Sequence, residues 1–322
     1  MEFGTHVLTL DPELEIAQIV TMMRQTIQHD FRRKGAIVGL SGGIDSATVL
    51  GLAVKAFGPQ RVLAVMMPEQ DSSPVSETYA AELAAKYGVT AIKEDLTAGL
   101  AGFGCYARRD AAVRAVFPDY DPSQDEIKLV LPADLLERGS LNVYSLSLSR
   151  PGGEERRRVL PVSAYLQIVA ASNMKQRSRM LMLYYHAEER NYAVIGTANR
   201  NEHAQGFFVK YGDGGADIQP IQHLYKTQIY QLARHLEVTQ AIIDRTPTTD
   251  TYSAECSQEE FYFRLPFEQM DLIWYGLDHD VPAAEVAAAL QLSPQQVENV
   301  YRDLAQKSRS TAYLRSIPLM VR

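Results

Sequence analysis

Short apolar runs alternate with amphipathic segments along most of the chain. The runs are rich in Val, Ile, Leu and Ala, a pattern that predicts strands buried on both faces. Strands are predicted over residues 36–40, 61–67, 89–93 and 192–196. Apolar residues at helical spacing predict helices over residues 11–33, 45–53, 73–87, 164–188 and 225–236. Because strands and helices alternate, we expect an α/β fold in which helices flank a doubly wound parallel sheet.

The pattern changes between about residues 105 and 160. Prolines interrupt it, and residues 143–149 alternate between apolar positions and serines, as in a strand with one polar face. The Arg-Pro-Gly-Gly sequence at residues 150–153 predicts a turn into a charged stretch. We interpret this region as an insertion that carries a β-hairpin. It serves as an oligomer contact, a lid or a surface elaboration without chemistry.

Two short helices are predicted over residues 282–290 and 293–307, within a C-terminal helical segment at about residues 266–310. Asp280 and Ser293 stand at the N-cap positions of these helices. The pair faintly resembles the helix-turn-helix of a nucleic-acid-binding module. However, its second helix is polar and acidic, which argues against contact with a phosphate backbone.

Composition narrows the class of protein. The 322 residues, 46% of them hydrophobic, can fill the core of one large α/β domain, and we expect residues 1–322 to form one. A net charge of -7 argues against wide non-specific binding to nucleic acid. Cys105 and Cys256 cannot form a disulfide framework, and neither has a metal-ligand spacing. No signal peptide or membrane-spanning run is recognisable, so we expect a cytoplasmic protein without a membrane partner.

Residues 35–50 contain the most informative motif. A predicted strand leads through Ser41, Gly42 and Gly43 directly into a predicted helix that begins near Asp45. Free backbone N–H groups at a helix start form an anion site, and phosphate is the usual anion. The motif is not a Walker motif, which has a Lys after its second Gly, nor a dinucleotide fingerprint, which has a third Gly. The Asp45 carboxylate stands where it would cap the helix or bind a cation.

A second glycine-rich stretch extends from Phe207 to Asp217. Three glycines surround Asp213, and Lys210 and Asp217 flank them. Ordering so many glycines costs conformational entropy, so a loop of this kind beside charged residues indicates a binding function. The alternative interpretation is a turn with solvated charges.

These stretches resemble known families. Ser41 to Ser46, Ser-Gly-Gly-Ile-Asp-Ser, resembles the signature of the ATP pyrophosphatases, the PP-loop enzymes that cleave ATP between its α- and β-phosphates. With further stretches the sequence resembles the NAD synthetases over about residues 15–310, apart from the insertion. The further stretches are Asn173–Met180, Gly196–Glu202, Lys210–Asp217, Leu224–Gln228 and Pro247–Asp250. The resemblance implies a fold like that of the adenine nucleotide alpha hydrolases.

The resemblance also implies a reaction. The carboxylate of nicotinic acid adenine dinucleotide (deamido-NAD) attacks the α-phosphate of ATP and pyrophosphate leaves. Ammonia then attacks the adenylated acyl group, which gives the amide of NAD and releases AMP. A carboxylate is a poor electrophile, and the mixed anhydride supplies a good leaving group. Because two anions must meet, the site must neutralise negative charge.

Residue roles follow from the matching positions. ATP would be bound by Gly39, Leu40, Ser41, Gly42, Gly43, Ile44, Asp45, Ser46, Thr197, Lys226 and Thr248. Asp45 and Glu202 would hold Mg²⁺, which prefers one or two carboxylates plus phosphates. Deamido-NAD would be bound by Arg177, Lys210, Asp217, Gln306 and Lys307, although many relatives have His-Lys where this chain has Gln306-Lys307. Asp45, Lys210 and Asp213 are the catalytic candidates. Taken singly, each charged residue could instead be a solvated helix charge or a cap.

The sequence departs from the family pattern in one loop. Relatives usually follow the Pro-Thr segment with an Asp-Glu pair, whereas this chain has Ser257-Gln-Glu-Glu-Phe-Tyr-Phe263. No glutaminase segment is recognisable, so free ammonia is the expected nitrogen donor unless a separate glutaminase subunit supplies it. The resemblance also implies a homodimer with the dinucleotide site at the subunit interface. The alternative function is that of a PP-loop ATP pyrophosphatase acting on another carboxylate or on tRNA.

Overall fold

The computed structural model describes residues 3–132, 135–137, 143–150, 152–249 and 251–320. Its strands are β1 (Ala36–Gly39), β2 (Val62–Met66), β3 (Thr90–Lys93), β4 (Glu126–Val130), β5 (Ser145–Ser149), β6 (Arg156–Val159) and β7 (Ala193–Ile195). Its α-helices are α1 (Pro12–Arg24), α2 (Ile44–Phe57), α3 (Pro74–Lys86), α4 (Thr97–Gly102), α5 (Cys105–Val116), α6 (Val162–Arg190), α7 (Arg200–Gln205), α8 (Lys226–His235), α9 (Gln240–Ile243), α10 (Phe267–Asp278), α11 (Ala283–Leu290) and α12 (Pro294–Ser310). No described helix is both long and apolar enough to cross a membrane.

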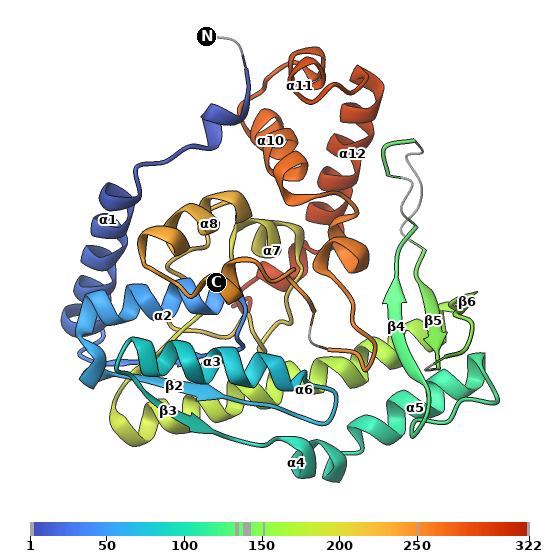
Figure 1. Ribbon diagram of the computed structural model, residues 1–322, viewed down its shortest axis with the longest axis horizontal. Helices are drawn as coiled ribbons and strands as arrows, with labels where there is room; N and C mark the ends of the chain where they lie inside the picture. The colour runs from blue at the N-terminus through green and yellow to red at the C-terminus, as the bar shows by residue number, and fades with distance from the viewer. Residues whose placement is uncertain (1–2, 133–134, 138–142, 151, 250, 321–322) are drawn as a thin grey trace.

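The centre of the molecule is a parallel sheet with the strand order β3-β2-β1-β7 (Figure 1). Ala36 of β1 pairs with Val62 of β2 and with Ala193 of β7, so the three strands are in register at their first residues. Helices α2 and α3 contribute to the core on one face of the sheet, and α6 packs on the other face. The predicted α/β fold with helices on both faces of a parallel sheet is confirmed.

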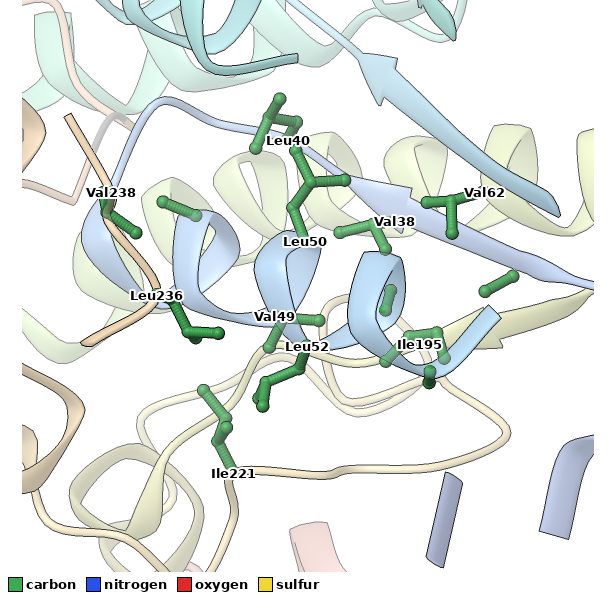
Figure 2. Packing of buried hydrophobic residues seen from close by; sticks show 14 of the residues in the cluster. Val38, Leu40, Val49, Leu50, Leu52, Val62, Ile195, Ile221, Leu236 and Val238 are labelled. Atoms are coloured by element: carbon green, nitrogen blue, oxygen red, sulfur yellow. The ribbon is translucent and has the colours of Figure 1, made fainter. Parts of the chain in front are cut away.

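Helix α2 is buried on nearly every side. Val49, Leu50 and Leu52 pack between β1, β7 and the chain that follows α8, and Figure 2 shows them surrounded by labelled side chains of those segments. Burying a side chain of this size contributes about 1.5–3 kcal/mol. The helix that begins at the predicted phosphate turn is therefore also the centre of the core.

The predicted helix over residues 11–33 begins as expected. Asp11 accepts hydrogen bonds from the backbone N–H groups of Glu13 (3.1 Å) and Leu14 (3.2 Å), and Pro12 occupies the first turn. The α-helical part ends at Arg24, and a π-helical segment, η2 (Gln25–Asp30), continues it.

The predicted hairpin is present as β5 and β6, and it belongs to an antiparallel sheet with the order β4-β5-β6. Strand β4 was not predicted. Residues 105–116, which we placed in the insertion, form α5, whose Ala112 and Val113 belong to the same core cluster as Ala164 and Ile168 of α6. Helix α6 extends from this sheet to the parallel sheet (Figure 1). Pro151 of the predicted turn lies outside the described residues.

Helices α10, α11 and α12 form a separate core cluster around Trp274, Val286 and Val300. The prediction for Ser293 is confirmed, because its side chain accepts a hydrogen bond from the Gln296 N–H (3.3 Å) in a capping box. The prediction that Asp280 caps the preceding helix is wrong. That helix, α11, has Pro282 as its N-cap residue and no side-chain cap, and Asp280 adopts a positive φ of 54° in the turn before it.

Candidate functional site

A cavity of about 980 Å³ opens at the carboxyl ends of three parallel strands. Gly39, Met66 and Ile195, the last residues of β1, β2 and β7, all line it. Ligands of open α/β sheets bind at this edge, outside the carboxyl ends of the strands. Further walls come from α3, α6, the loop after α7, residues 245–249, 251 and 252, and residues of α12 and the segment after it.

The predicted phosphate turn lines this cavity at the start of α2. Gly42 has a φ of +73°, and a Cβ there would collide with the carbonyl oxygen of Ser76 in α3, so only glycine fits. The Ser46 hydroxyl donates to the Gly43 carbonyl (2.9 Å) and lies 3.1 Å from the Ser41 hydroxyl. Gly43 is the N-cap residue of α2 and has no side-chain cap. The start of α2 therefore lines the cavity without a side-chain cap on its first N–H groups, and Ser41 and Ser46 line the cavity beside it, as an anion site requires.

Asp45 forms an ion pair with Lys226 at the beginning of α8. Its other carboxylate oxygen accepts a hydrogen bond from the Asn199 side chain (3.0 Å). The Lys226 side chain is fully buried, and its ammonium also lies 5.4 Å from the centre of the Phe267 ring. Burial lowers the pKa of Lys226, but Asp45 and Glu202 outweigh it and the net pKa is raised. The lysine is therefore charged and held beside the phosphate turn.

Glu202 lies beside this pair. It completes a capping box at the start of α7, because its carboxylate accepts from the Asn199 N–H (3.1 Å) while the Asn199 side chain accepts from the Glu202 N–H (3.0 Å). The Gln258 side chain donates to its other oxygen (3.3 Å). Burial and the neighbouring Asp45 charge raise the pKa of Glu202 to about 8. The carboxyl groups of Asp45 and Glu202 thus lie beside the single ammonium group of Lys226. A further positive charge at this place would therefore be stabilised.

The second glycine-rich stretch also lines the cavity, from Phe207 to Asp213 and at Gly215. The Asp213 carboxylate accepts from the Val209 N–H (2.7 Å), which holds the turn of the loop together. Enclosure by the surrounding protein raises the pKa of Asp213 to about 6. The Lys210 ammonium donates to the carbonyls of Tyr313 (2.9 Å) and Ser316 (2.7 Å), so it holds the C-terminal segment at the cavity.

The predicted substrate contacts differ in their placement. Arg177 of α6 and Lys307 of α12 line the cavity, whereas Asp217, Gln306 and Gly42 are not among the residues that line it. The Asp217 carboxylate accepts from the Val194 N–H (2.8 Å) and the Tyr184 hydroxyl (3.2 Å), so it is engaged in holding the edge of β7. The buried Lys307 ammonium donates to the Tyr262 carbonyl (2.7 Å), and burial lowers its pKa.

Aromatic side chains line one end of the cavity. Tyr144, which directly precedes β5 in the insertion, stacks on Tyr165 of α6 with 4.9 Å between ring centres, and Phe261 packs against it at 5.7 Å. All three rings line the cavity, together with Phe207, Tyr252 and Tyr262. The insertion therefore contributes directly to the cavity wall.

Sequence reasoning missed three residues that hold the site together. Asn199 and Gln258 bond to Asp45 and Glu202, and the Arg245 side chain donates to the Ser76 hydroxyl (2.8 Å) behind the phosphate turn. For Asn199 a signal existed, because Asn followed three residues later by Glu is the pattern of a capping box. Gln258 stands in the loop that departs from the family pattern, and its neighbours Glu259 and Glu260 bond to the Phe267 N–H and to Lys128 of β4. Asp250 of the Pro247–Asp250 stretch lies outside the described residues.

The parallel sheet, the glycine turn without a Walker lysine and the acidic and basic groups beside it define a PP-loop protein, of the ATP pyrophosphatase class. The family model described as NAD synthase matches residues 15–112 and 158–318. The chain therefore belongs to the NAD synthase family, as predicted. Residues 113–157, which include β4 and β5 and Tyr144, lie outside the match.

Comparison with individual proteins agrees with this placement. An NH(3)-dependent NAD(+) synthetase of Rhizobium meliloti (strain 1021) is 46% identical over 319 residues, 99% of this chain and 95% of that protein. Two solved structures share the fold at 20% identity and a TM-score of 0.63. One is the NH3-dependent NAD synthetase of Campylobacter jejuni subsp. jejuni NCTC 11168 in complex with the nitrate ion, with 98% of this chain and 100% of that chain covered. The other is the NMN synthetase of Francisella tularensis, with 97% and 99% covered.

Proposed function

We propose that this protein forms NAD by the ATP-dependent amidation of deamido-NAD with ammonia, through an adenylated carboxylate. The observation that carries the proposal is one cavity that joins the α2 phosphate turn, with Asp45, Glu202 and Lys226, to a second wall with Arg177 and Lys210. The first group suits ATP and the second an anionic acceptor, so one cavity can bring both anions together. The name of the relative that is 46% identical supports the same reaction.

The phosphate turn binds the β- and γ-phosphates through the N–H groups at the start of α2 and the hydroxyls of Ser41 and Ser46. Lys226 neutralises charge on the leaving pyrophosphate and is already positioned by its ion pair with Asp45. Thr197 and Thr248 also line the cavity and supply further hydroxyl contacts to ATP. These groups favour the transition state because they are fixed before the reaction begins.

Asp45 and Glu202 fit a Mg²⁺ ion. Mg²⁺ usually takes one or two protein carboxylates and completes its coordination with phosphates and water. Here two carboxylates converge beside the phosphate turn, and burial together with the neighbouring Asp45 charge raises the pKa of Glu202. When bound, Mg²⁺ supplies charge neutralisation on the phosphates. Among the described residues no group of three or more His, Cys, Asp or Glu side chains could form a cage of protein ligands, which agrees with a shared site of this kind.

Deamido-NAD is bound on the wall formed by α6 and the second glycine-rich loop. Arg177 and Lys210 contact its phosphates, Asp213 keeps the loop in shape, and Lys307 lies at the far end of the wall. Asp217 and Gln306 stay predictions, since neither lines the cavity. The site is completed in a homodimer, because α6 also presents exposed apolar side chains next to Arg177, among them Leu181 (58% exposed) and Tyr185 (56%).

The test measures NAD and AMP formed from ATP, Mg²⁺, an ammonium salt and deamido-NAD. We expect equal amounts of both products, and glutamine in place of ammonium should give neither product unless a separate glutaminase is added. Two other acceptors are tested in place of deamido-NAD, because each corresponds to a different function. They are the deamido mononucleotide, which would make NMN, and tRNA. AMP release that depends on either of these acceptors and not on deamido-NAD would overturn the proposal.

The same assay tests the site through Asp45→Asn. Asparagine keeps a side chain that can bond to Asn199, whereas alanine would leave the buried Lys226 ammonium without its nearest partner and would destabilise the fold. We expect turnover to fall at least about 100-fold. Asp30→Asn, a change of an exposed carboxylate at the end of η2, is the control that should leave turnover unchanged.

A further inference from the structure

Lys175 lies on α6 between residues that line the cavity, but it does not line the cavity itself. Its neighbours Asn173 and Gln176 do, whereas the Lys175 side chain is fully buried behind the wall. A fully buried lysine is rare and requires partners, because an isolated charge in the protein interior is strongly destabilising.

The Lys175 ammonium has three partners, one for each of its N–H donors. It donates to Glu69 (2.9 Å), to Asp71 (2.6 Å) and to the backbone carbonyl of Thr251 (2.7 Å). The first two belong to the loop that follows β2, and the third belongs to the segment that follows α9. One side chain therefore joins two segments that are about 180 residues apart in the chain.

Both segments form walls of the cavity. The loop after β2 lines it with Pro68 and Ser72, and the segment from 246 to 252 lines it with Thr248 and Tyr252, among others. The loop after β2 also leads into α3, whose Ser76 carbonyl packs against Gly42 of the phosphate turn. A shift of either segment would therefore alter the space between the phosphate turn and Thr248.

The carboxylates that receive Lys175 are shared with a second buried cation. Arg109 of α5 pairs with Asp71 and with Asp110 (3.0 Å), and the Tyr106 hydroxyl donates to Glu69 (2.9 Å). Arg109 thus stabilises the same carboxylate cluster, but it has no bond to the segment at 246–252 in the described structure. The two cations differ in one respect that matters here, the bond to Thr251.

We propose that Lys175 is a positioning residue for ATP. It fixes Thr251, and with it the cavity-lining residues 246–249 and 252, against the loop after β2, and so sets the width of the nucleotide end of the cavity. The assignment of ATP to this end rests on the proposed function. Lys175 itself touches neither substrate. Lys175 keeps the two cavity walls at a fixed separation. Removing its ammonium group would release this separation even in a variant that stays folded.

The test compares three variants in the amidation assay and in calorimetric ATP binding without the acceptor. Lys175→Met removes the bond to Thr251 and leaves Glu69 and Asp71 with one cation between them. Lys175→Met combined with Glu69→Gln removes the same bond while the net charge of the cluster stays as in the wild type. Arg109→Met disturbs the cluster and keeps the bond to Thr251, so it is the matched control.

We expect Lys175→Met and the double variant to raise both the KM and the Kd for ATP about 10-fold or more, which is what a lost charge-assisted hydrogen bond costs. The KM for deamido-NAD should change less than about 3-fold, and the double variant should recover thermal stability without recovering ATP affinity. Arg109→Met should lower thermal stability but leave the KM for ATP within about 3-fold of the wild type.

Three results would overturn the inference: an unchanged Kd for ATP in the double variant, an equal loss of ATP affinity in Arg109→Met, or failure of both Lys175 variants to fold, which would assign Lys175 to stability alone. Failure of the proposed function is seen separately, because the wild-type protein would then show no ATP-dependent amidation at all.

Discussion

Single side chains at this site carry two tasks each. Asp45 neutralises Lys226 and accepts from Asn199, and Glu202 caps α7 while it faces the same lysine. The groups proposed to bind substrate are therefore also bonded to one another in the absence of ligand. This arrangement keeps them in place, which limits the entropy that is lost when ATP binds.

Asp271 supports this group from behind. It is fully buried in α10, and its carboxylate accepts from the Thr227 N–H (2.7 Å) at the start of α8 and from the Asn201 side chain in α7. Asp271 thus holds the two helix starts that carry Lys226 and Glu202 in fixed relation. Burial raises its pKa to about 6, although both hydrogen bonds lower it.

This pKa predicts how stability depends on pH. The folded-state pKa lies above the ordinary value of 3.8, so the neutral form favours folding and its contribution is complete at low pH. The free energy of unfolding therefore falls as the pH rises from about 3.8 towards about 6. The total loss is about 3 kcal/mol, because each unit of pKa shift corresponds to about 1.4 kcal/mol. Urea unfolding of wild type and Asp271→Asn between pH 4.5 and 7 should show the wild type losing free energy of unfolding relative to the variant. Parallel curves would contradict the assignment.

At the scale of elements, α2 has a glycine with positive φ next to each end. Gly42 precedes it in the phosphate turn with a φ of +73°, and Gly58 follows its last turn with a φ of +77°. A Cβ at Gly42 would collide with the Ser76 carbonyl, whereas a Cβ at Gly58 would meet nothing within 4 Å. The two positions share a backbone requirement and differ in packing.

We therefore expect Gly42→Ala and Gly58→Ala to differ in their effect on the affinity for ATP. Each alanine costs about 1–3 kcal/mol because its φ is positive. Gly42→Ala must also move α3 away from the turn, so the Kd for ATP should rise at least about 10-fold, while Gly58→Ala should leave it unchanged. Thermal unfolding and calorimetric ATP titration of both variants measure the two effects. Equal ATP affinity in the two variants would show that the turn tolerates displacement of α3.

Elements with a strong local pattern were predictable from the sequence. The four parallel strands and helices α2, α3, α6 and α8 have long apolar runs or helical periodicity, and the residues of the phosphate turn are contiguous in the chain. Strand β4 was missed because its Glu-Ile-Lys-Leu-Val sequence contains two charged residues and no continuous apolar run, and because pairing with β5 stabilises it. The bonds from Asn199 to Asp45 and from Lys175 to Thr251 were also missed. They join residues 154 and 76 positions apart, and no local pattern reports such contacts.

At the scale of the whole molecule, separate apolar cores surround one cavity. The largest lies under the parallel sheet around α2, the second joins the antiparallel sheet to α5 and α6, and the third holds α10 to α12 together. Figure 1 shows α6 reaching from the antiparallel sheet to the parallel sheet. This helix therefore connects the core of the antiparallel sheet, through Ile168, with a smaller cluster on the other face of the parallel sheet, through Ala187. Residues of both its halves, among them Tyr165 and Arg177, line the cavity.

The exposed side of α6 predicts the assembly. Val162, Leu166, Leu181 and Tyr185 are all more than half exposed, and their spacing places them on one broad side of the helix. We expect a homodimer through this side. Leu181→Glu should weaken dimerisation at least about 100-fold, because it places an unpaired charge at the interface, and should lower turnover with it. Sedimentation velocity measures the first effect and the NAD assay the second.

Phe103→Glu provides the control for this prediction. Phe103 is 61% exposed at the end of α4, outside the exposed side of α6, and its replacement should change neither the oligomeric state nor turnover. A wild-type protein that sediments as a monomer at assay concentration and is fully active would contradict the prediction.

Lys55 is the one exposed residue of α2. Substitutions are tolerated mainly at exposed positions, and α2 has almost no exposed surface. A change near the phosphate turn therefore also affects the core that supports it. We therefore expect most substitutions within α2 to lower the free energy of unfolding, so adaptation to a different cellular concentration of ATP should occur elsewhere in the cavity wall. The proposed function places the loop after β2 and residues 246–249, 251 and 252 along the nucleotide, so we expect substitutions there to alter its fit.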